Sequence, residues 1–456
     1  MRLIRELEGC PPIHEIFRQL YREEDAVFLD SSLQNQLGRY SVIGLHPYLK
    51  LVKGEDFTVN GVQQEESFED FLRRYLKEHP DVNDTGLPIV SGAIGYFSYE
   101  YGRKKEGVRT RHETEVTIPD CILNFYDDFI IQDEREKRLY LVANGIRKPA
   151  EQALEELEKL ARGNNLRKPE QEPENRAAEN PRPAFSAAPN FEKEAYKQAV
   201  QDMIRYITEG DIYIANMTQH LKITSPKEPW EVFEYLRLHN PSPFGGYFHY
   251  GDFQVVCASP ERFLRMQNGH VMTRPIKGTR KRGATPEEDL AMRRELEASE
   301  KDKSELLMIV DLERNDLNRV CVPGSVKVTE LFTVEEYATV FHLVSNVEGD
   351  LAPGMTVMDL IEAAFPGGSI TGAPKLRAME IIDELEHGQR NLYTGSMGYL
   401  TLDGCCDFNI VIRTALYRDG AYYLGVGGGI TCESELEFEY EETLQKAKAI
   451  LEALQE

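Results

Sequence analysis

Short β-rich runs and longer helix-periodic segments alternate along most of this chain, and this alternation restricts it to a fold that mixes sheets and helices. Runs rich in Val, Ile, Leu, Tyr and Phe are typical of strands, whereas apolar residues that recur every three or four positions are typical of helices. The sequence predicts strands over 26–29, 139–142, 409–413 and 421–424, and helices over 151–160, 195–207, 286–296 and 357–364.

Two of the expected helix starts carry capping residues. Thr285 stands before Pro286 and three residues before Glu288, and Ser434 stands three residues before Glu437. A Ser or Thr followed three positions later by Glu is typical of a capping box, and proline is favoured in the first helical turn. We therefore expect one helix to begin directly after Thr285 and another directly after Ser434.

One stretch, residues 166–190, interrupts the alternation. It is rich in Pro, Asn, Glu and Ala and lacks periodic apolar residues. Such a composition is typical of a linker or a long excursion. The sequence therefore predicts an N-terminal region over 1–165 and a C-terminal region over 191–456.

Charge and composition exclude several classes of protein. The 53 basic and 77 acidic residues give a net charge of −24, which disfavours nucleic acid as a partner. The seven cysteines are scattered and include no C-x-x-C pair, which disfavours both disulfides and structural zinc. The first residues are charged and no long apolar run occurs, so we expect no signal peptide and no membrane association. A cytoplasmic protein is the expectation.

Two pairs of carboxylates stand at helical spacing. Glu439, Glu442 and Lys446 lie three and four positions apart beside the apolar stripe of the final helix, and Asp302 and Glu305 form a second pair. Two helices that each offer a carboxylate pair could hold Mg²⁺, which prefers oxygen ligands. The alternative for each pair is a solvated helix flank, and the spacing does not decide between them.

Two further segments could bind an anion or supply a nucleophile. Gly427, Gly428 and Gly429 match no nucleotide-binding loop, but successive glycines allow backbone amides to approach a carboxylate. The alternative is a tight β-connection. Lys277 lies in a basic segment between Ile276 and Gly278, and a lysine kept from water can act as a nucleophile. The alternative there is a basic surface loop.

Six ordered motifs resemble those of the chorismate-utilising enzymes, and most closely those of component I of aminodeoxychorismate synthase and of anthranilate synthase. The N-terminal likeness is weaker, because Leu29-Asp30-Ser31-Ser32 stands where the anthranilate enzymes have Leu-Leu-Glu-Ser for inhibition by tryptophan. The motifs are Ser259-Pro260-Glu261-Arg262-Phe263, Pro275-Ile276-Lys277-Gly278-Thr279, Asp311-Leu312-Glu313-Arg314-Asn315-Asp316, His342-Leu343-Val344-Ser345, Gly372-Ala373-Pro374-Lys375 and Gly427-Gly428-Gly429.

The resemblance implies an α+β fold in which two large antiparallel β-sheets pack face to face with helices on the outside. It also implies that chorismate and Mg²⁺ bind in a cleft of the C-terminal region, with Glu261 as the general acid and His342 near the reacting ring. Glu305 and Glu442 would be the principal metal carboxylates, with Asp302 and Glu439 nearby. The implied substrate-binding residues are Gly278, Thr279, Tyr393, Arg413, Gly427, Gly428, Gly429 and Lys446.

Lys277 distinguishes the two branches of the family that transfer an amino group. Anthranilate synthases typically have alanine at this position, so the resemblance implies amination at C4 through a covalent adduct on Lys277. The product would be 4-amino-4-deoxychorismate, which leads to para-aminobenzoate and folate. The alternative is component I of anthranilate synthase, which makes anthranilate for tryptophan synthesis.

The source of the nucleophile is also implied by the resemblance. Relatives that use water have a lysine where this chain has Ile214, and an alkyl side chain cannot deprotonate water. The ammonia-using relatives usually have glutamine there, so Ile214 departs from both patterns. The sequence has no glutaminase segment with a nucleophilic cysteine, and we therefore expect a separate glutamine amidotransferase subunit to supply ammonia.

Overall fold

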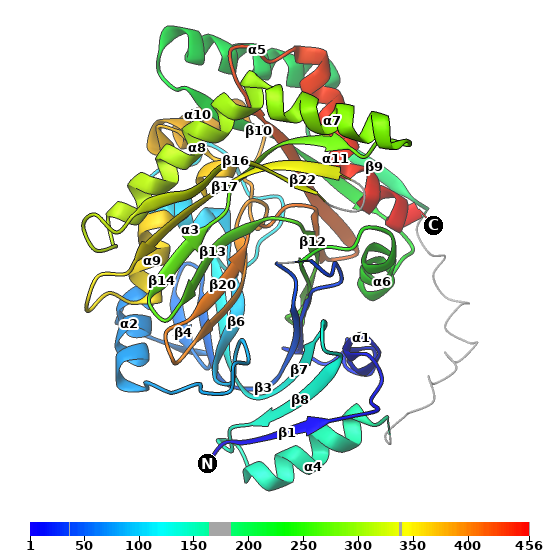
Figure 1. The fold of residues 1–456 in the computed structure, drawn as a ribbon, viewed down its shortest axis with the longest axis vertical. Coiled ribbons are helices and arrows are strands. Elements are labelled where there is room, and N and C mark those ends of the chain that lie inside the picture. Colours follow the sequence, from blue (N-terminus) through cyan, green and yellow to red (C-terminus); the bar gives the residue numbers. More distant parts are fainter. Residues whose placement is uncertain (36, 164–183, 337–339, 456) are drawn as a thin grey trace.

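The computed structural model describes residues 1–35, 37–163, 184–336 and 340–455 (Figure 1). Hydrogen bonds link the strands of this part of the chain into one network, and every pairing in it is antiparallel. The long strands β3 (Tyr40–Lys53) and β7 (Cys121–Asp133) pair along almost their whole length. They join two parts of the network that fold over each other.

The first part of the network runs outward from the β3–β7 pair in both directions. Its hydrogen-bonded order is β1 (Leu3–Leu7), β8 (Arg138–Ala143), β7, β3, β2 (Val27–Asp30), β11 (Phe244–His249), β12 (Phe253–Ser259), β21 (Thr414–Arg418), β22 (Ala421–Ile430) and β10 (Ile214–Thr224). The short strands β9 (Ser186–Pro189) and β18 (Gly372–Ala373) pair with β10 on the edge opposite β22. The short strand β4 (Phe57–Val59) pairs with the C-terminal end of β3, and β5 (Val62–Gln63) pairs with β4.

The second part of the network begins at the N-terminal half of β7, on the same edge that pairs with β8 farther along the strand. Its order is β6 (Gly92–Phe97), β19 (Ser396–Thr401), β20 (Cys406–Asn409), β13 (Arg262–Gln267), β14 (His270–Thr273) and β17 (Val340–Asp350), with β15 (Ile276–Lys281) and β16 (Lys327–Glu336) also paired with β17.

Alternating side chains along the strands build one core between the two sheet parts and one core outside each part. On β12, Val255 packs in the central core with Tyr96 of β6 and Met397 of β19, whereas Val256 faces the helices. Successive residues of a strand point to opposite faces, which is why one strand serves both layers. The predicted α+β fold with two antiparallel sheets face to face is confirmed, although β3 and β7 connect the sheets.

Helices cover the outer faces, and their apolar residues recur at helical spacing. In α4 (Ala150–Ala161) the buried residues include Ala150, Ala153, Leu154 and Leu157, which form one face against the sheet. The first sheet part is covered by α1 (Ile13–Phe17), α4, α6 (Pro229–His239) and α11 (Leu436–Gln455), and the second by α2 (Phe68–Glu78), α3 (Tyr99–Lys105), α7 (Pro286–Ala298), α8 (Glu300–Asn318) and α9 (Val357–Ala364). Helices α5 (Lys193–Glu209) and α10 (Lys375–Leu385) pack beside β10 at the end of the molecule that is uppermost in Figure 1.

The four predicted helices correspond to α4, α5, α7 and α9, and three of the four predicted strands correspond to β2, β8 and β22. The strand predicted over 409–413 is wrong. β20 ends at Asn409, and Arg413 has a φ of 49°, a left-handed conformation that interrupts a strand before β21 begins.

The two predicted caps have different outcomes. Thr285 caps α7, because its hydroxyl accepts a hydrogen bond from the Glu288 backbone amide. The cap predicted at Ser434 is wrong, since α11 begins at Leu436 and the Ser434 hydroxyl donates to the Glu439 carboxylate at 2.6 Å.

The division of the chain into 1–165, 166–190 and 191–456 stays a prediction. Residues 166–183 lie outside the described residues, while Ser186–Pro189, near the end of the predicted linker, forms β9 and pairs with β10. Strands from both flanking regions pair with each other, as β2 does with β11 and β6 with β19. No helix in the described part of the chain is long and apolar enough to cross a membrane.

Candidate active site

A cavity of about 470 Å³ opens between β15, β17, β22, α8 and α11, and it brings together residues that are far apart in the sequence. Its volume is within the usual range for small-molecule sites. Fourteen of the predicted site residues line it: Glu261, Lys277, Gly278, Thr279, Asp302, Glu305, His342, Tyr393, Arg413, Gly427, Gly429, Glu439, Glu442 and Lys446.

Gly428 does not line the cavity, but it and its neighbours explain why β22 carries glycines here. A Cβ atom on Gly428 would lie 2.6 Å from the Glu442 Oε2 atom. A Cβ atom on Gly429 would lie 3.3 Å from the Lys277 Nζ atom. The Gly427 carbonyl accepts a hydrogen bond from Lys446 Nζ at 2.8 Å. Glycine at these positions therefore lets polar side chains from two other elements approach the strand backbone.

Lys277 and Glu261 meet at Ser369. The Lys277 Nζ atom donates to the Ser369 carbonyl at 3.2 Å, and the Ser369 hydroxyl donates to Glu261 Oε1 at 2.7 Å. No carboxylate of the described residues lies within ion-pair distance of Lys277. Burial raises the pKa of Glu261, and this effect outweighs the hydrogen bond from Ser369 and the nearby lysine charges. A carboxyl group that retains its proton can act as an acid.

The strand that carries Lys277 is irregular at the next residue. The register between β15 and β17 shifts between Lys277 and Thr279, and Gly278 at this point has a φ of 69°. A side chain at Gly278 would also collide with Asp302. A left-handed glycine at such a bulge bends the strand and fixes the direction of the side chains on either side.

Arg413 and His342 occupy another part of the wall. The Arg413 guanidinium has no hydrogen bond or ion pair with any described residue, and burial lowers its pKa. Thr279 Oγ1 and His342 Nδ1 are hydrogen-bonded at 2.9 Å. Burial, with a smaller contribution from the Arg413 charge, lowers the pKa of His342 to about 4, so the imidazole is neutral at pH 7. The Arg413 guanidinium is therefore available to bind an anionic ligand.

The two predicted carboxylate pairs lie on the same cavity, Asp302 and Glu305 on α8 and Glu439 and Glu442 on α11. Burial raises the pKa of Glu305 and of Glu439, and the negative charge of Glu442 adds to both increases. Asp302 pairs with Arg280 at 3.1 Å and Glu442 with Lys446 at 3.0 Å, whereas Glu305 has no such partner among the described residues.

These carboxylates fit Mg²⁺, although they are not gathered as a complete set of ligands. Within the described ranges, no group of three or more His, Cys, Asp or Glu side chains is arranged to hold a metal ion. Mg²⁺ commonly uses one or two protein carboxylates, and substrate oxygens and waters complete its octahedron. The oxygen-only donor set and the uncompensated Glu305 are consistent with that mode of binding.

The cavity also includes residues that the sequence did not single out, namely Asn216, Arg280, Lys301, Ser369 and Phe438. Ser369 lies three residues before the motif Gly372-Ala373-Pro374-Lys375 and belongs to none of the six motifs. Nothing in its spacing indicates that its hydroxyl reaches Glu261, because the two residues lie 108 positions apart. Only the fold reveals that contact.

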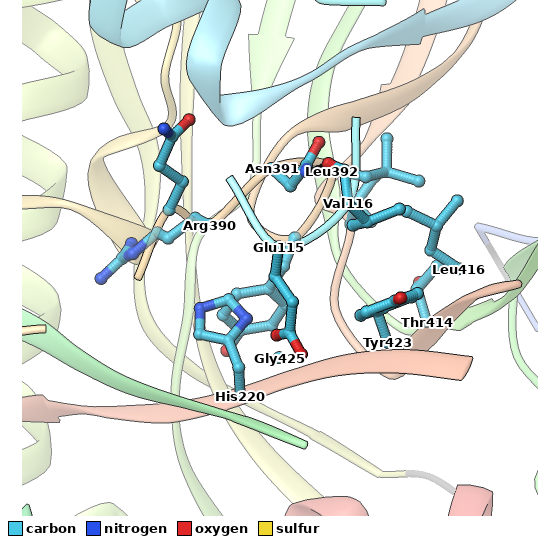
Figure 2. Close-up of a pocket in the computed structure, with 13 residues that line it drawn as sticks. Glu115, Val116, His220, Arg390, Asn391, Leu392, Thr414, Leu416, Tyr423 and Gly425 are labelled. Atoms are coloured by element: carbon cyan, nitrogen blue, oxygen red, sulfur yellow. Dashed lines mark hydrogen bonds between the residues drawn. The ribbon is translucent and has the colours of Figure 1, made fainter. Parts of the chain in front are cut away.

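Two other cavities lie elsewhere in the described part of the chain. One of about 630 Å³ includes Asp30 and Ser31 from the segment that resembles the tryptophan motif. Burial raises the pKa of Asp30 to about 6. The other, of about 30 Å³, shares Tyr393 and Gly425 with the candidate active site, and Figure 2 shows Glu115 and His220 close together beside Gly425.

The sequence matches the model of the chorismate binding enzyme family over residues 24–452. The chain belongs to this family. Aminodeoxychorismate synthase component 1 of Bacillus subtilis (strain 168) is 38% identical over 430 residues, which cover 92% of this chain and 90% of that protein. Anthranilate synthase component 1 of Acetivibrio thermocellus is 34% identical over 453 residues, which cover 96% and 91%.

Two solved structures resemble the fold. Anthranilate synthase component I from Streptococcus pneumoniae TIGR4 aligns with a TM-score of 0.81 and 29% identity, covering 92% of this chain and 93% of that chain. The menaquinone-specific isochorismate synthase from Escherichia coli aligns with a TM-score of 0.71 at 17% identity, which reflects the fold alone. The predicted family, fold class and enzymatic nature of the chain are confirmed.

Proposed function

We propose that this enzyme aminates chorismate at C4 and releases 4-amino-4-deoxychorismate, an intermediate for para-aminobenzoate and folate. The observation that carries the proposal is the amine of Lys277 inside the cavity, linked through Ser369 to the buried Glu261. The relatives named aminodeoxychorismate synthase component 1 support the same choice.

Binding of the substrate follows from the free charge in the cavity. Chorismate carries two carboxylates, and a protein of net charge −24 needs local positive charge to hold them. Arg413 can form a bidentate pair with one carboxylate because none of the described residues pairs with its guanidinium. Lys446 supplies a further positive charge at the same cavity, where its Nζ atom also donates to the Gly427 carbonyl.

The reaction then divides into two displacements. The Lys277 amine attacks C2, both ring double bonds shift, and the C4 hydroxyl leaves as water with a proton from Glu261. Ammonia attacks C4 in the second displacement, the double bonds shift back, and the Lys277 amine leaves C2. The raised pKa of Glu261 is consistent with the acid role, because the carboxyl must be protonated when the hydroxyl departs.

Glu305 and Glu442 would hold Mg²⁺, with Asp302 and Glu439 beside them. A magnesium ion bound there would neutralise the ring carboxylate of the substrate and favour loss of the C4 hydroxyl. Two residues of the chain would orient the substrate around that carboxylate. Arg413 would attract it by its charge, and Tyr393 would contact it from the cavity wall.

Ile214 supports ammonia over water as the nucleophile. Both the Ile214 Cδ1 atom and the Lys277 Nζ atom lie near Gly429. They are 3.6 and 3.3 Å, respectively, from the position that a Cβ atom on Gly429 would occupy. Ile214 is buried, so an apolar side chain that cannot deprotonate water stands where the relatives that use water have a lysine base. Ammonia needs no such base. A separate glutamine amidotransferase subunit would supply it, as the names "component 1" of the relatives suggest.

The deciding experiment supplies the purified chain with chorismate, Mg²⁺ and ammonium salt at alkaline pH and identifies the product. We expect 4-amino-4-deoxychorismate with ammonium, and no turnover with glutamine alone. Without ammonia, intact-mass spectrometry should detect chorismate minus water on the peptide that contains Lys277, and Lys277→Ala should abolish this adduct. Anthranilate as the sole product, with no adduct, would instead identify the chain as component I of an anthranilate synthase.

A further inference from the structure

Ser369 contacts both groups that the proposed reaction requires. Its hydroxyl donates to Glu261 Oε1 at 2.7 Å, and its backbone carbonyl accepts from Lys277 Nζ at 3.2 Å. Ser369 lies in the short 3₁₀ helix Gly368–Ile370 and is 8% exposed. One buried residue therefore bridges the acid and the amine, which come from β15 and from the end of β12.

The backbone next to Ser369 is held by hydrogen bonds from side chains that do not line the cavity. Arg390, which is almost fully buried, donates to the Ile370 carbonyl at 2.7 Å and pairs with Glu386 at 2.6 Å. The Thr371 hydroxyl donates to the Gly367 carbonyl at 2.8 Å. Backbone on both sides of Ser369 is thus held by protein contacts, so its orientation does not depend on bound substrate.

We propose that Ser369 is a positioning residue, which orients the carboxyl group of Glu261 toward the departing hydroxyl and the amine of Lys277 toward the ring. Because the hydroxyl of Ser369 donates to Oε1, the acidic proton of Glu261 is held on Oε2. Because one N–H of Lys277 is directed to the Ser369 carbonyl, the nitrogen lone pair points away from that carbonyl. The roles of the two partners rest on the proposed function.

A change in pH dependence separates this role from a purely structural one. The hydrogen bond from Ser369 stabilises ionised Glu261 and lowers its pKa, against the larger opposite effect of burial. The other charged or titratable groups that act on Glu261 are Lys277, Lys446, Glu313 and Tyr393. Loss of the Ser369 hydroxyl leaves these groups in place and raises the pKa of Glu261. Since the acid must be protonated, activity is then lost at a higher pH than in the wild type.

The experiment compares Ser369→Ala with Ser369→Thr, which keeps the hydroxyl. Chorismate consumption with Mg²⁺ and ammonium is measured from neutral to alkaline pH. For Ser369→Ala we expect kcat to fall about tenfold, a part of the roughly 10²- to 10⁴-fold contribution of a general acid, with KM unchanged. The high-pH limb of the kcat profile should move to higher pH, and Ser369→Thr should restore both quantities.

Ser225→Ala is the matched control, because the buried Ser225 hydroxyl donates to the Leu454 carbonyl at 2.6 Å outside the cavity. Circular dichroism establishes folding, and Ser369→Cys, which keeps the volume with a weak donor, replaces Ser369→Ala if the latter does not fold. An unchanged kcat and pH profile would overturn the proposal. So would an equal loss at every pH that Ser369→Thr fails to rescue.

This test and that of the proposed function can fail separately. Departure of the C4 hydroxyl is required for anthranilate as well as for 4-amino-4-deoxychorismate, so chorismate consumption reports on Glu261 in either case. Anthranilate as the product would contradict the proposed function and leave the role of Ser369 toward Glu261 in place. A wild-type profile in Ser369→Ala, with 4-amino-4-deoxychorismate as the product, would contradict only the role of Ser369.

Discussion

The two larger cavities differ in how their charges are compensated. In the cavity of about 630 Å³, Arg39 pairs with Asp133 at 2.7 Å and Arg262 pairs with Asp407 at 2.9 Å. In the candidate active site, of about 470 Å³, Arg413 has no partner among the described residues. Burying an uncompensated charge costs free energy, so such a charge indicates a ligand that supplies the missing counter-charge. The difference lies in Arg413, because every other arginine of the two cavities donates at least one hydrogen bond to a described residue.

The same contrast separates Arg413 from Arg390, although both are arginines of the C-terminal region. Arg390 directs its donors to Glu386, the Ile370 carbonyl and the Asn216 carbonyl, and it lies over the ring of Tyr99. Its charge is used inside the protein and is not available to a substrate. The comparison therefore indicates that Arg390 supports the cavity wall, and it is consistent with the proposal that Arg413 binds an anion.

The largest expected effect tests the uncompensated carboxylate. Removal of divalent cations, or Glu305→Gln, should reduce chorismate consumption below detection, because several kcal/mol of charge stabilisation at the substrate are lost. Glu305→Gln should keep the wild-type unfolding midpoint and should weaken Mg²⁺ binding in calorimetric titrations. Glu300→Gln on the exposed side of α8 is the control and should retain activity. Full turnover in metal-free buffer would contradict the assignment of the carboxylates.

The second prediction concerns Arg390, the compensated arginine that supports the cavity wall. Arg390→Met should lower the free energy of unfolding by about 3–5 kcal/mol, because it leaves Glu386 buried without its partner. The double variant Arg390→Met/Glu386→Leu should recover part of this loss, since it removes both charges. Chemical denaturation of the three proteins measures the difference. Equal stability of wild type and Arg390→Met would mean that the pair does not support the wall.

The smallest effect compares the two cavities directly. Arg413→Gln should raise the KM for chorismate by an amount that corresponds to about 1.5–3 kcal/mol, the value of a hydrogen bond to a charged group. Its free energy of unfolding should stay the same or increase, because an uncompensated buried charge is removed. Arg39→Gln should do the opposite, lowering stability by about 1 kcal/mol with an unchanged KM. The same KM for both variants would remove the distinction between the cavities.

The sequence predicted elements best where local signals agree with the fold. The helices over 286–296 and 357–364 carry their own periodicity, and both are confirmed as α7 and α9. The strand over 409–413 failed because its apolar residues are buried in an irregular connection, which the left-handed Arg413 ends. The cap at Ser434 failed because the helix begins only at Leu436, and the Ser434 hydroxyl accepts from the Thr431 amide instead of from a helical amide.

In the candidate site, too, contacts between residues close in the sequence were predicted, whereas contacts between separate elements were not. Helical spacing alone brought Asp302 and Glu305 together, and likewise Glu439 and Glu442, since residues three positions apart share a helix face. The meeting of α8 and α11 at one cavity could not be predicted from spacing, because it depends on the order of strands between them. Ser369 went unnoticed for the same reason.

The sequence by itself therefore determined the family, the mixed α and β character, the carboxylate pairs and the presence of a lysine where related enzymes differ. These features depend on residue type and on contacts within a few positions of the chain. The tertiary structure decided which charges are compensated, because pairing between Arg390 and Glu386 or isolation of Arg413 depends on burial and on neighbours. It also decided that Ser369 joins Glu261 to Lys277, since hydrogen bonds between distant residues require that separate strands and helices converge on one cavity.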